Sequence, residues 1–307
     1  MKKVLIATDK PFAPVAVKGI REVVEKAGYE LCLLEKYTTP EQLNEAAAHV
    51  DAMIVRSDLV TREVLNAAKN LKIVVRAGAG YDNIDLAAAT EKGVVVMNTP
   101  GQNSNAVAEL ALGMMVYGAR GLFSGKSGSE LKGKTIGIHA FGNVGRYVAG
   151  IAKGFGMDVY AYDAFVPKED ITKAGVKAVD SAEELYKTCQ YISLHIPAND
   201  KTKKSIGTAL LSLMPNDGVL VNTARKEVIN EEELLQVMEE KAKFQYLSDV
   251  APDTAETFQT KFAGRYFATP KKMGAQTEEA NINAGIAAAV QIRDFFENGD
   301  IKYKVNK

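Results

Sequence analysis

The sequence predicts an α/β protein with two doubly wound parallel sheets, each covered by helices. Short runs rich in Val, Ile and Leu alternate with amphipathic stretches along the whole chain, a pattern typical of parallel sheets buried on both faces. The 307 residues are enough for two domains with separate cores. A long apolar stretch divides the expected strands into two sets, which places one sheet on each side of it.

The first set of expected strands comprises residues 4–9, 30–36, 52–57, 71–78 and 93–99. The dividing stretch, Asn103 to Gly121, is rich in Ala and Gly and predicts a buried linking helix. The polar run "GLFSGKSGSELKGK" that follows predicts a surface loop, and a new fold begins at Lys134. The second set comprises residues 134–140, 158–163, 191–197, 218–224, 244–250 and 265–270. Helical periodicity fills most gaps, as at 15–27, 231–241 and 277–298.

Composition argues against several classes of partner. The formal net charge is zero and no long block of like charge occurs, so we expect neither nucleic acid nor a membrane surface as a main partner. The N-terminus shows no signal peptide, and Cys32 and Cys189 lie in apolar segments without a second ligand nearby. We therefore expect a cytoplasmic protein with free thiols and no metal site.

The most informative stretch is "KTIGIHAFGNVGRYVAGIAKGFGMDVYAYD", which reads as strand, tight turn, helix and second strand. Gly142, Asn143, Val144 and Gly145 occupy the turn, where backbone N–H groups at a helix N-terminus can bind a pyrophosphate. Asp163 ends the second strand, where a carboxylate accepts hydrogen bonds from ribose hydroxyls and repels a 2′-phosphate. The stretch predicts a dinucleotide site that prefers NAD.

Ala140 departs from this fingerprint, because its first position is usually glycine. Alanine fits without strain if φ is negative there, and otherwise costs about 1 kcal/mol or more.

Further motifs follow in order: "RAGAGYDNID" (76–85), "VVVMNTPGQNSNAVAEL" (94–110), "SLHIP" (193–197), "VNTARKEVI" (221–229) and "SDV" (248–250). With these the chain resembles the D-isomer-specific 2-hydroxyacid dehydrogenases over nearly its whole length. The resemblance implies a discontinuous substrate domain (1–97 and 278–307), a Rossmann-like NAD domain (98–277), and an active-site cleft between them. It also implies a homodimer, with the 103–121 helix and the following loop at the interface. Because the chain ends at Lys307, we expect no C-terminal regulatory domain.

The resemblance assigns roles to individual residues. Arg225 would hold the substrate carboxylate and polarise its C2 oxygen, since a planar guanidinium can bond both. The amides of Gly78 and Ala79 would bind the same carboxylate, and Asp249 the nicotinamide amide. Arg56 and Ser57 would face the far end of the substrate, where a phosphate would lie. Further expected cofactor contacts are His195, Ile196, Pro197, Thr223, Ala224 and Gly274, and a further substrate contact is Asn103.

Two catalytic positions of the family differ here. Its histidine is replaced by Lys271 or Lys272: counting from Pro270 favours Lys271, whereas the longer match beginning at Gly274-Ala275 favours Lys272. Neighbouring residues of an extended segment point to opposite sides, so only one of the two can face the site.

The glutamate that pairs with this histidine in the family is replaced by Thr254. Without that carboxylate, partial burial and the charge of Arg225 would lower the pKa of Lys272, which allows it to act as base and acid. Asp253 or Glu256 could take the place of the missing carboxylate, which would oppose this effect.

The resemblance favours NAD-dependent oxidation of a phosphorylated D-2-hydroxy acid. One alternative is reduction of hydroxypyruvate or glyoxylate, which differs only in the distal pocket. The other is an NAD-binding sensor whose catalytic site has decayed, and the retained Arg225 and Asp249 argue against it.

Overall fold

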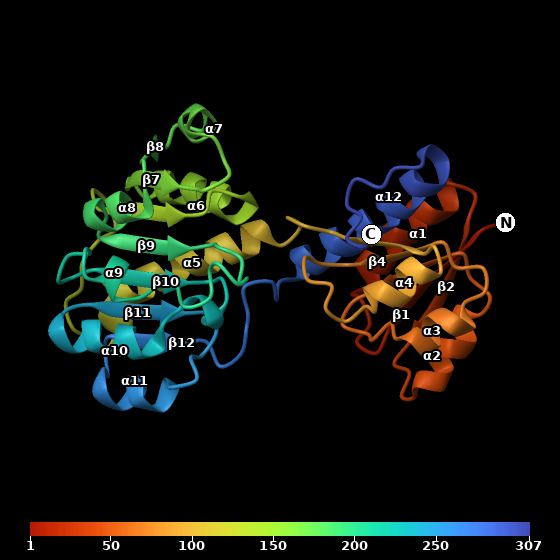
Figure 1. The fold of residues 1–307 in the computed structure, drawn as a ribbon, viewed down its shortest axis with the longest axis horizontal. Helices are drawn as coiled ribbons and strands as arrows, with labels where there is room; N and C mark the ends of the chain where they lie inside the picture. The colour runs from red at the N-terminus through yellow and green to blue at the C-terminus, as the bar shows by residue number, and fades with distance from the viewer. The chain divides into compact units, whose positions relative to one another are not determined.

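The computed structural model describes residues 1–307, which form two compact units. Unit 1 contains Met1–Asn103 and Gln276–Lys307, and unit 2 contains Ser104–Ala275. The expected domain limits, after residue 97 and before residue 278, lie a few residues from these. Each unit has one parallel sheet with helices on both faces (Figure 1), which confirms the predicted α/β class.

The sheet of unit 1 has the strand order β2-β1-β3-β4-β5. Its strands are β1 (Lys3–Thr8), β2 (Glu30–Glu35), β3 (Ala52–Val55), β4 (Ile73–Arg76) and β5 (Val95–Asn98). Its helices are α1 (Pro14–Lys26), α2 (Pro40–Ala47), α3 (Arg62–Ala67), α4 (Leu86–Glu91) and α12 (Glu278–Asn298).

Two cores stabilise unit 1, one on each face of the sheet. Helices α2, α3 and α4 cover one face, and α1 and α12 cover the other. The last residues of the chain reach the free edge of the sheet, where Val305 N donates to Val96 O at 2.9 Å. Val96 N in turn donates to the side chain of Asn306 at 2.9 Å. The C-terminal segment thus covers an edge that would otherwise expose backbone groups.

The sheet of unit 2 has the strand order β12-β11-β10-β9-β6-β7-β8. Its strands are β6 (Thr135–His139), β7 (Asp158–Tyr162), β8 (Lys177–Ala178), β9 (Tyr191–Leu194), β10 (Val219–Asn222), β11 (Gln245–Ser248) and β12 (Tyr266–Ala268). Its helices are α5 (Ser104–Ala119), α6 (Asn143–Gly154), α7 (Lys168–Lys173), α8 (Ala182–Thr188), α9 (Thr208–Leu211), α10 (Glu231–Glu240) and α11 (Ala255–Lys261), with 3₁₀ turns η1 (Gly121–Phe123) and η2 (Lys226–Val228).

Helices α5 and α6 cover one face of this sheet, and α8 to α11 cover the other. The chain order reverses between β6 and β9, which lie side by side with β7 beyond β6. In doubly wound sheets ligands bind beyond the carboxyl ends of the strands at such a point. The segments that follow β6, β7, β9, β10, β11 and β12 all leave from this edge.

Candidate functional site

The turn after β6 has the form expected of a pyrophosphate site. Helix α6 begins at Asn143 without a side-chain cap on its first turn, so the amides there are free to bind an anion. A Cβ placed on Gly142 would meet no atom within 4 Å, whereas one on Gly145 would meet the carbonyl oxygen of Ala140. Gly142 therefore leaves room for a ligand, and Gly145 allows close packing of helix and strand.

Asp163 connects this turn to the end of β7. Its Oδ2 accepts a hydrogen bond from Phe141 N at 2.7 Å, and its Oδ1 accepts from Phe165 N at 2.8 Å and Val166 N at 3.0 Å. The carboxylate is thus held by backbone groups at the position where the sequence predicts ribose contacts. The residues of this turn fit a bound dinucleotide.

Two histidines at the carboxyl ends of β6 and β9, His139 and His195, are neutral at pH 7. Burial lowers the pKa of His139 to about 4, and its Nδ1 lies 3.1 Å from the hydroxyl of Tyr186. Burial, and then the charge of His139, lowers the pKa of His195 to about 3. His195 lies between Ser193 Oγ, 2.9 Å from its Nε2, and Thr223 Oγ1, 3.3 Å from its Nδ1. Ile196 is buried and Pro197 is exposed. We expected no acid–base role for His195, and both rings are partly buried and neutral at pH 7.

The turn after β10 presents Arg225. The side chain of Asn222 fixes this turn, because it accepts a hydrogen bond from Ala224 N at 2.9 Å and donates one to Arg225 O at 3.1 Å. The guanidinium of Arg225 is exposed and makes no ion pair or hydrogen bond within the protein. It is therefore free to bind an anionic ligand.

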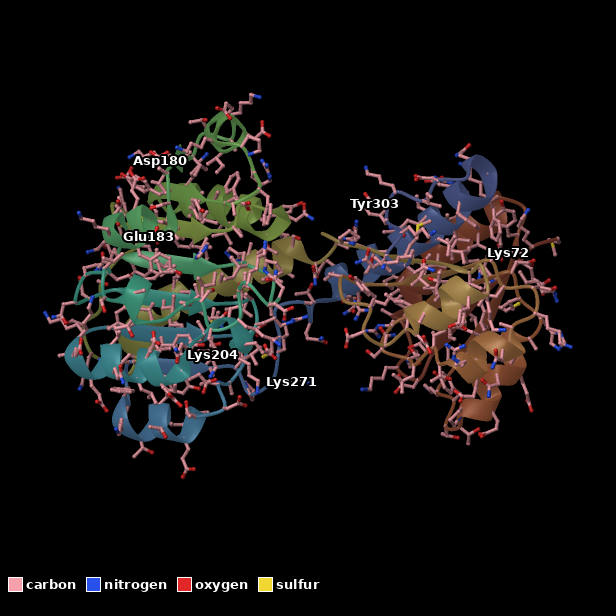
Figure 2. All side chains as sticks on the ribbon, in the orientation of Figure 1. Lys72, Asp180, Glu183, Lys204, Lys271 and Tyr303 are labelled. Atoms are coloured by element: carbon pink, nitrogen blue, oxygen red, sulfur yellow. The ribbon has the colours of Figure 1, made fainter.

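The two candidate lysines differ in their contacts. Lys272 Nζ donates to the carbonyl oxygen of Ala224 at 3.1 Å, which places its ammonium beside the residue that precedes Arg225. Lys271, labelled in Figure 2, is exposed and its side chain makes no hydrogen bond. Of the two, Lys272 is the one that the fold brings beside Arg225. Lys272 is exposed, so the partial burial that the sequence analysis expected for it is wrong, and the charge of Arg225 is the part of that argument that remains.

Asp249 is fully buried next to these lysines. Its Oδ1 accepts a hydrogen bond from Met273 N at 2.7 Å, and its Oδ2 accepts from Gly274 N at 2.8 Å. A Cβ on Gly274 would lie 2.9 Å from Asp249 Oδ2. The sequence assigned Asp249 and Gly274 to the cofactor, and the contacts between the two residues were not predicted.

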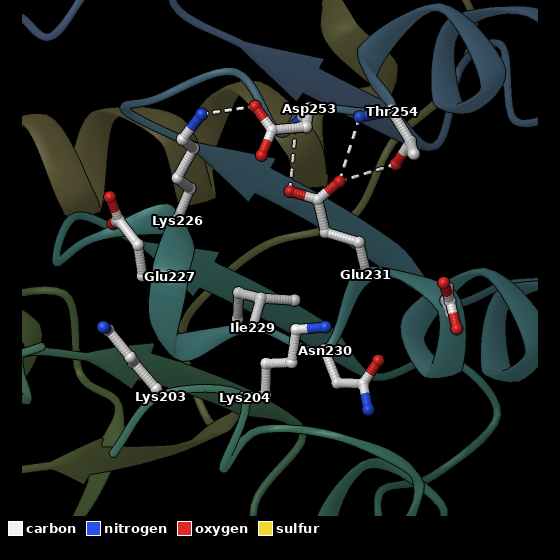
Figure 3. A pocket seen from close by; sticks show the side chains of 10 residues that line it. Lys203, Lys204, Lys226, Glu227, Ile229, Asn230, Glu231, Asp253 and Thr254 are labelled. Carbon is white, nitrogen blue, oxygen red and sulfur yellow. Dashed lines mark hydrogen bonds and ion pairs between the residues drawn. The ribbon is translucent and has the colours of Figure 1, made fainter. Parts of the chain in front are cut away.

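Thr254 stands at the position of the family's glutamate, and neither carboxylate considered as a replacement, Asp253 or Glu256, pairs with Lys272 (Figure 3). Thr254 donates from its N at 2.9 Å and from its Oγ1 at 2.7 Å to Glu231 Oε2, while Asp253 forms an ion pair with Lys226. Glu256 is exposed in the first turn of α11. No ion pair joins a carboxylate to Lys272.

In unit 1, Arg56 lies at the carboxyl end of β3. Its guanidinium donates to Lys10 O at 3.0 Å and to Asn281 Oδ1 at 2.8 Å, and it packs over the ring of Phe12. These neutral partners orient the side chain without neutralising its charge. Ser57 is exposed beside it and makes no side-chain hydrogen bond.

Arg76, at the end of the neighbouring strand β4, was missed by the sequence analysis. Its Nε donates to Arg56 O at 3.0 Å, and it forms no ion pair within the protein. Burial lowers the pKa of Arg76; the carboxylate of Asp82 opposes this shift and the charge of Arg56 adds to it. A signal was present: "AMIVRS" and "LKIVVRAG" both place Val-Arg at a strand end.

The loop after β4 packs against the side chain of Arg76. Gly78 has a φ of 147°, and a Cβ there would collide with the Arg76 guanidinium. Gly78 N donates to Arg76 O at 2.9 Å, so the amide of Ala79, which has no partner within the protein, is the free donor of this loop. Asn98 Nδ2 holds the loop through Ala79 O at 2.6 Å. Asn103 is the last residue of this segment of unit 1 and directly precedes helix α5.

Two further observations concern the whole chain. No group of His, Cys, Asp and Glu side chains is arranged to hold a metal ion. None of the helices combines the length and the apolar character that crossing a bilayer requires.

Comparison with known proteins identifies relatives. A family model described as the NAD binding domain of D-isomer specific 2-hydroxyacid dehydrogenase matches residues 108–266. D-3-phosphoglycerate dehydrogenase of Methanocaldococcus jannaschii is 37% identical over 95% of this chain, which spans 57% of that enzyme's length. Hydroxypyruvate reductase of Thermotoga maritima is 38% identical over 86% of this chain and 90% of its own. The crystal structure of NAD⁺-bound 3-phosphoglycerate dehydrogenase of Entamoeba histolytica is 51% identical, with a TM-score of 0.84 over 100% of this chain and 99% of its own.

Proposed function

Since this chain belongs to the D-isomer-specific 2-hydroxyacid dehydrogenases, we propose that it oxidises D-3-phosphoglycerate to 3-phosphohydroxypyruvate with NAD, a step of serine biosynthesis. The observation that supports this substrate is the pair of arginines at the ends of β3 and β4. Arg56 and Arg76 are adjacent, and neither forms an ion pair with a carboxylate. Two guanidinium groups side by side repel each other, and although the carboxylate of Asp82 acts on Arg76, it forms no ion pair with it, so an anion bound by both arginines would stabilise the pair.

A phosphate is the best match for this pair. Guanidinium groups bind phosphate oxygens with paired, charge-assisted hydrogen bonds, and a dianionic phosphate would compensate both charges. Hydroxypyruvate and glyoxylate have no anionic group at the far end, so they would leave both arginines unpaired.

Arg225 would bind the substrate carboxylate. Its guanidinium has no partner within the protein, and the side chain of Asn222 fixes the backbone that presents it. The free amide of Ala79 would supply a second donor to the same group. Held in this way, the C2 hydroxyl is oriented for reaction, and Arg225 stabilises the charge that develops on its oxygen.

Lys272 would be the acid and base. As a neutral amine it takes the proton of the C2 hydroxyl, and as an ammonium it returns that proton in the reverse direction. NAD, held by the turn at Gly142–Gly145 and by Asp163, would accept hydride from C2. The absence of an ion-paired carboxylate at Lys272 supports this role, because such a partner would hold the lysine in its charged form.

The first test is formation of NADH from D-3-phosphoglycerate. Lys272→Ala should lower kcat about a hundredfold or more and leave the affinity for NADH nearly unchanged. Lys271→Ala is the matched control and should retain activity. If Lys272→Ala is fully active, Lys272 is not the base; if the wild-type protein binds NADH and turns over no 2-hydroxy acid, it is a dinucleotide-binding sensor.

The second test separates the two enzymatic candidates. Similarity to a hydroxypyruvate reductase favours an unphosphorylated substrate, and reduction of hydroxypyruvate is therefore the alternative. Arg56→Ala and Arg76→Ala should each raise KM for the phosphorylated substrate at least tenfold and change KM for hydroxypyruvate little. Equal effects on both substrates would exclude a phosphate contact.

A homodimer is part of the same proposal. Leu122 and Phe123, which follow α5, both have positive φ, and Phe123 is 67% exposed. An exposed aromatic ring on a strained segment is expected where a second chain covers it. Phe123→Ser should weaken the dimer, and light scattering after size-exclusion chromatography measures this; a wild-type monomer would contradict the proposal.

A further inference from the structure

The segment between β12 and α12 is held by one buried carboxylate. Asp249, which follows β11, has no exposed surface, and each of its oxygens accepts a backbone hydrogen bond, from Met273 N at 2.7 Å and from Gly274 N at 2.8 Å. Thr269 Oγ1 lies 3.1 Å from Asp249 Oδ1 and 2.8 Å from the carbonyl oxygen of Lys271. The carboxylate and the hydroxyl therefore fix the segment on both sides of Lys271 and Lys272.

This arrangement has a physical reason. A buried carboxylate is costly unless donors surround it, and buried amides are equally costly without an acceptor. Asp249 and the two amides satisfy one another, and replacing either partner leaves the other unpaired. No side chain fits at Gly274, because its Cβ would lie 2.9 Å from Asp249 Oδ2 and 3.2 Å from Val107.

The consequence is a choice between two adjacent lysines. The Met273 and Gly274 amides directly follow Lys272, so binding them to Asp249 fixes the backbone from which the Lys272 side chain leaves. With the amides on Asp249, Lys272 Nζ reaches Ala224 O at 3.1 Å beside Arg225, whereas the side chain of Lys271 makes no hydrogen bond; both side chains are exposed.

We propose that Asp249 is a positioning residue: by binding the Met273 and Gly274 amides it holds Lys272 beside Arg225. The catalytic consequence rests on the proposed function, in which Lys272 is the base. The role is distinct from the nicotinamide contact that the sequence predicts for Asp249, and the two have different experimental signatures.

The test is Asp249→Asn, in which one amide of the segment must face an NH₂ group instead of an oxygen. We expect amide hydrogen exchange in residues 271–276 to rise at least tenfold, with the protection of β9, β10 and β11 unchanged. A displacement of about 1 Å at a reacting group costs about a hundredfold in rate, so kcat should fall by this order, whereas the Kd for NADH should change less than threefold.

Thr269→Val provides a milder variant if Asp249→Asn does not fold. It removes the hydroxyl at nearly constant volume and should shift exchange and kcat in the same direction by a smaller factor. Thr208→Val is the matched control, because the Thr208 hydroxyl bonds the carboxylate of Glu233 at 2.8 Å, away from this segment. It should change neither quantity.

The outcomes are distinguishable. Unchanged exchange in residues 271–276 of Asp249→Asn would overturn the positioning role. Unchanged exchange with NADH affinity reduced more than tenfold would overturn it in favour of a nicotinamide contact. Faster exchange with unchanged kcat would support the positioning of the segment and contradict the catalytic role of Lys272 under the proposed function.

Discussion

Ala140 is an alanine in a backbone conformation that suits glycine. It has a φ of 83° in the turn between β6 and α6, so the strain that the sequence made conditional on positive φ is present. Relief of this strain, about 1 kcal/mol, exceeds the extra entropy that glycine loses on folding. Ala140→Gly should therefore stabilise the protein by roughly 0.5 kcal/mol, and Ala140→Val should destabilise it, as measured by urea unfolding.

Ala164 is the control for this prediction. It lies in the exposed loop after β7 and does not have a positive φ, so Ala164→Gly gains no strain relief and should lose roughly 0.5 kcal/mol. If Ala140→Gly is destabilised to the same extent, the alanine is not strained.

Because His139 and His195 are neutral in the folded protein, we expect the protein to lose stability in acid. Their pKa values are lowered to about 4 and about 3 in the folded protein, against about 6.5 when unfolded. Below pH 6.5 the unfolded chain takes up protons that the folded chain does not, so stability falls as pH decreases. At pH 5 the loss should reach up to about 2 kcal/mol per histidine.

The measurement is the change in unfolding free energy between pH 7 and pH 5. His195→Gln should reduce this change, and comparing slopes cancels the variant's own loss of stability. His49→Gln, at an exposed position of unit 1, should leave the slope as in the wild type. An unaltered slope in His195→Gln would show that the pKa of this histidine is not lowered in the folded protein.

Single residues were predictable where a motif fixes their position along the chain. The turn at Gly142 and Gly145 and the end of β7 at Asp163 follow from spacing alone. Arg76, the partners of Asp249 and the ion pair of Asp253 were not found, because each depends on a segment distant in sequence that only the folded chain brings close. The contact of Lys272 with Ala224 likewise joins distant segments, and the choice between Lys271 and Lys272 stays a prediction.

At the scale of elements, two of the three glycines of helix α6, Gly145 and Gly150, have opposite requirements. A Cβ on Gly145 would meet the carbonyl oxygen of Ala140, whereas one on Gly150 would meet nothing within 4 Å. Gly145→Ala should thus separate α6 from β6 and abolish NADH binding. Gly150→Ala should stabilise the protein by about 0.5–1 kcal/mol through helix propensity alone.

The pair is measured by thermal unfolding and NADH titration. Because the same change is made twice on one helix, differences in propensity cancel. Normal NADH binding in Gly145→Ala would mean that this turn does not need the close approach.

Every strand expected from the sequence is present, most of them shorter than predicted. The end residues that the sequence assigned to strands at 56–57, 77–78 and 223–224 belong instead to the segments that carry Arg56, Gly78 and Thr223. Apolar runs mark buried strands well, but they do not show where backbone pairing stops. Strand β8, Lys177–Ala178, was missed because a two-residue edge strand contains no periodicity.

At the scale of the molecule, unit 1 is formed by two segments far apart in the chain. Helices α1 and α12 approach closely: a Cβ on Gly19 would lie 2.6 Å from Ile286, and one on Gly285 would lie 3.0 Å from Ile20. Ala284, Ala288, Ala289 and Ile292 of α12 complete the core on this face of the sheet. Unit 2 is one continuous segment whose cores use only its own residues.

This difference predicts how the chain responds to truncation. A chain that ends at Ala275 lacks α12 and the segment that pairs with β5, so the apolar faces of α1, β1 and β3 lose their cover. We expect unit 1 to unfold, because that loss exceeds the few kcal/mol by which a domain is stable, whereas unit 2 should keep its fold and bind NADH with unchanged Kd. Amide hydrogen exchange resolves the two units in one experiment, and a full-length Phe12→Leu variant, altered in the same core without loss of a segment, should keep both protected. Retained protection of β1 and α1 in the truncated chain would show that residues 1–103 fold without the C-terminal helix.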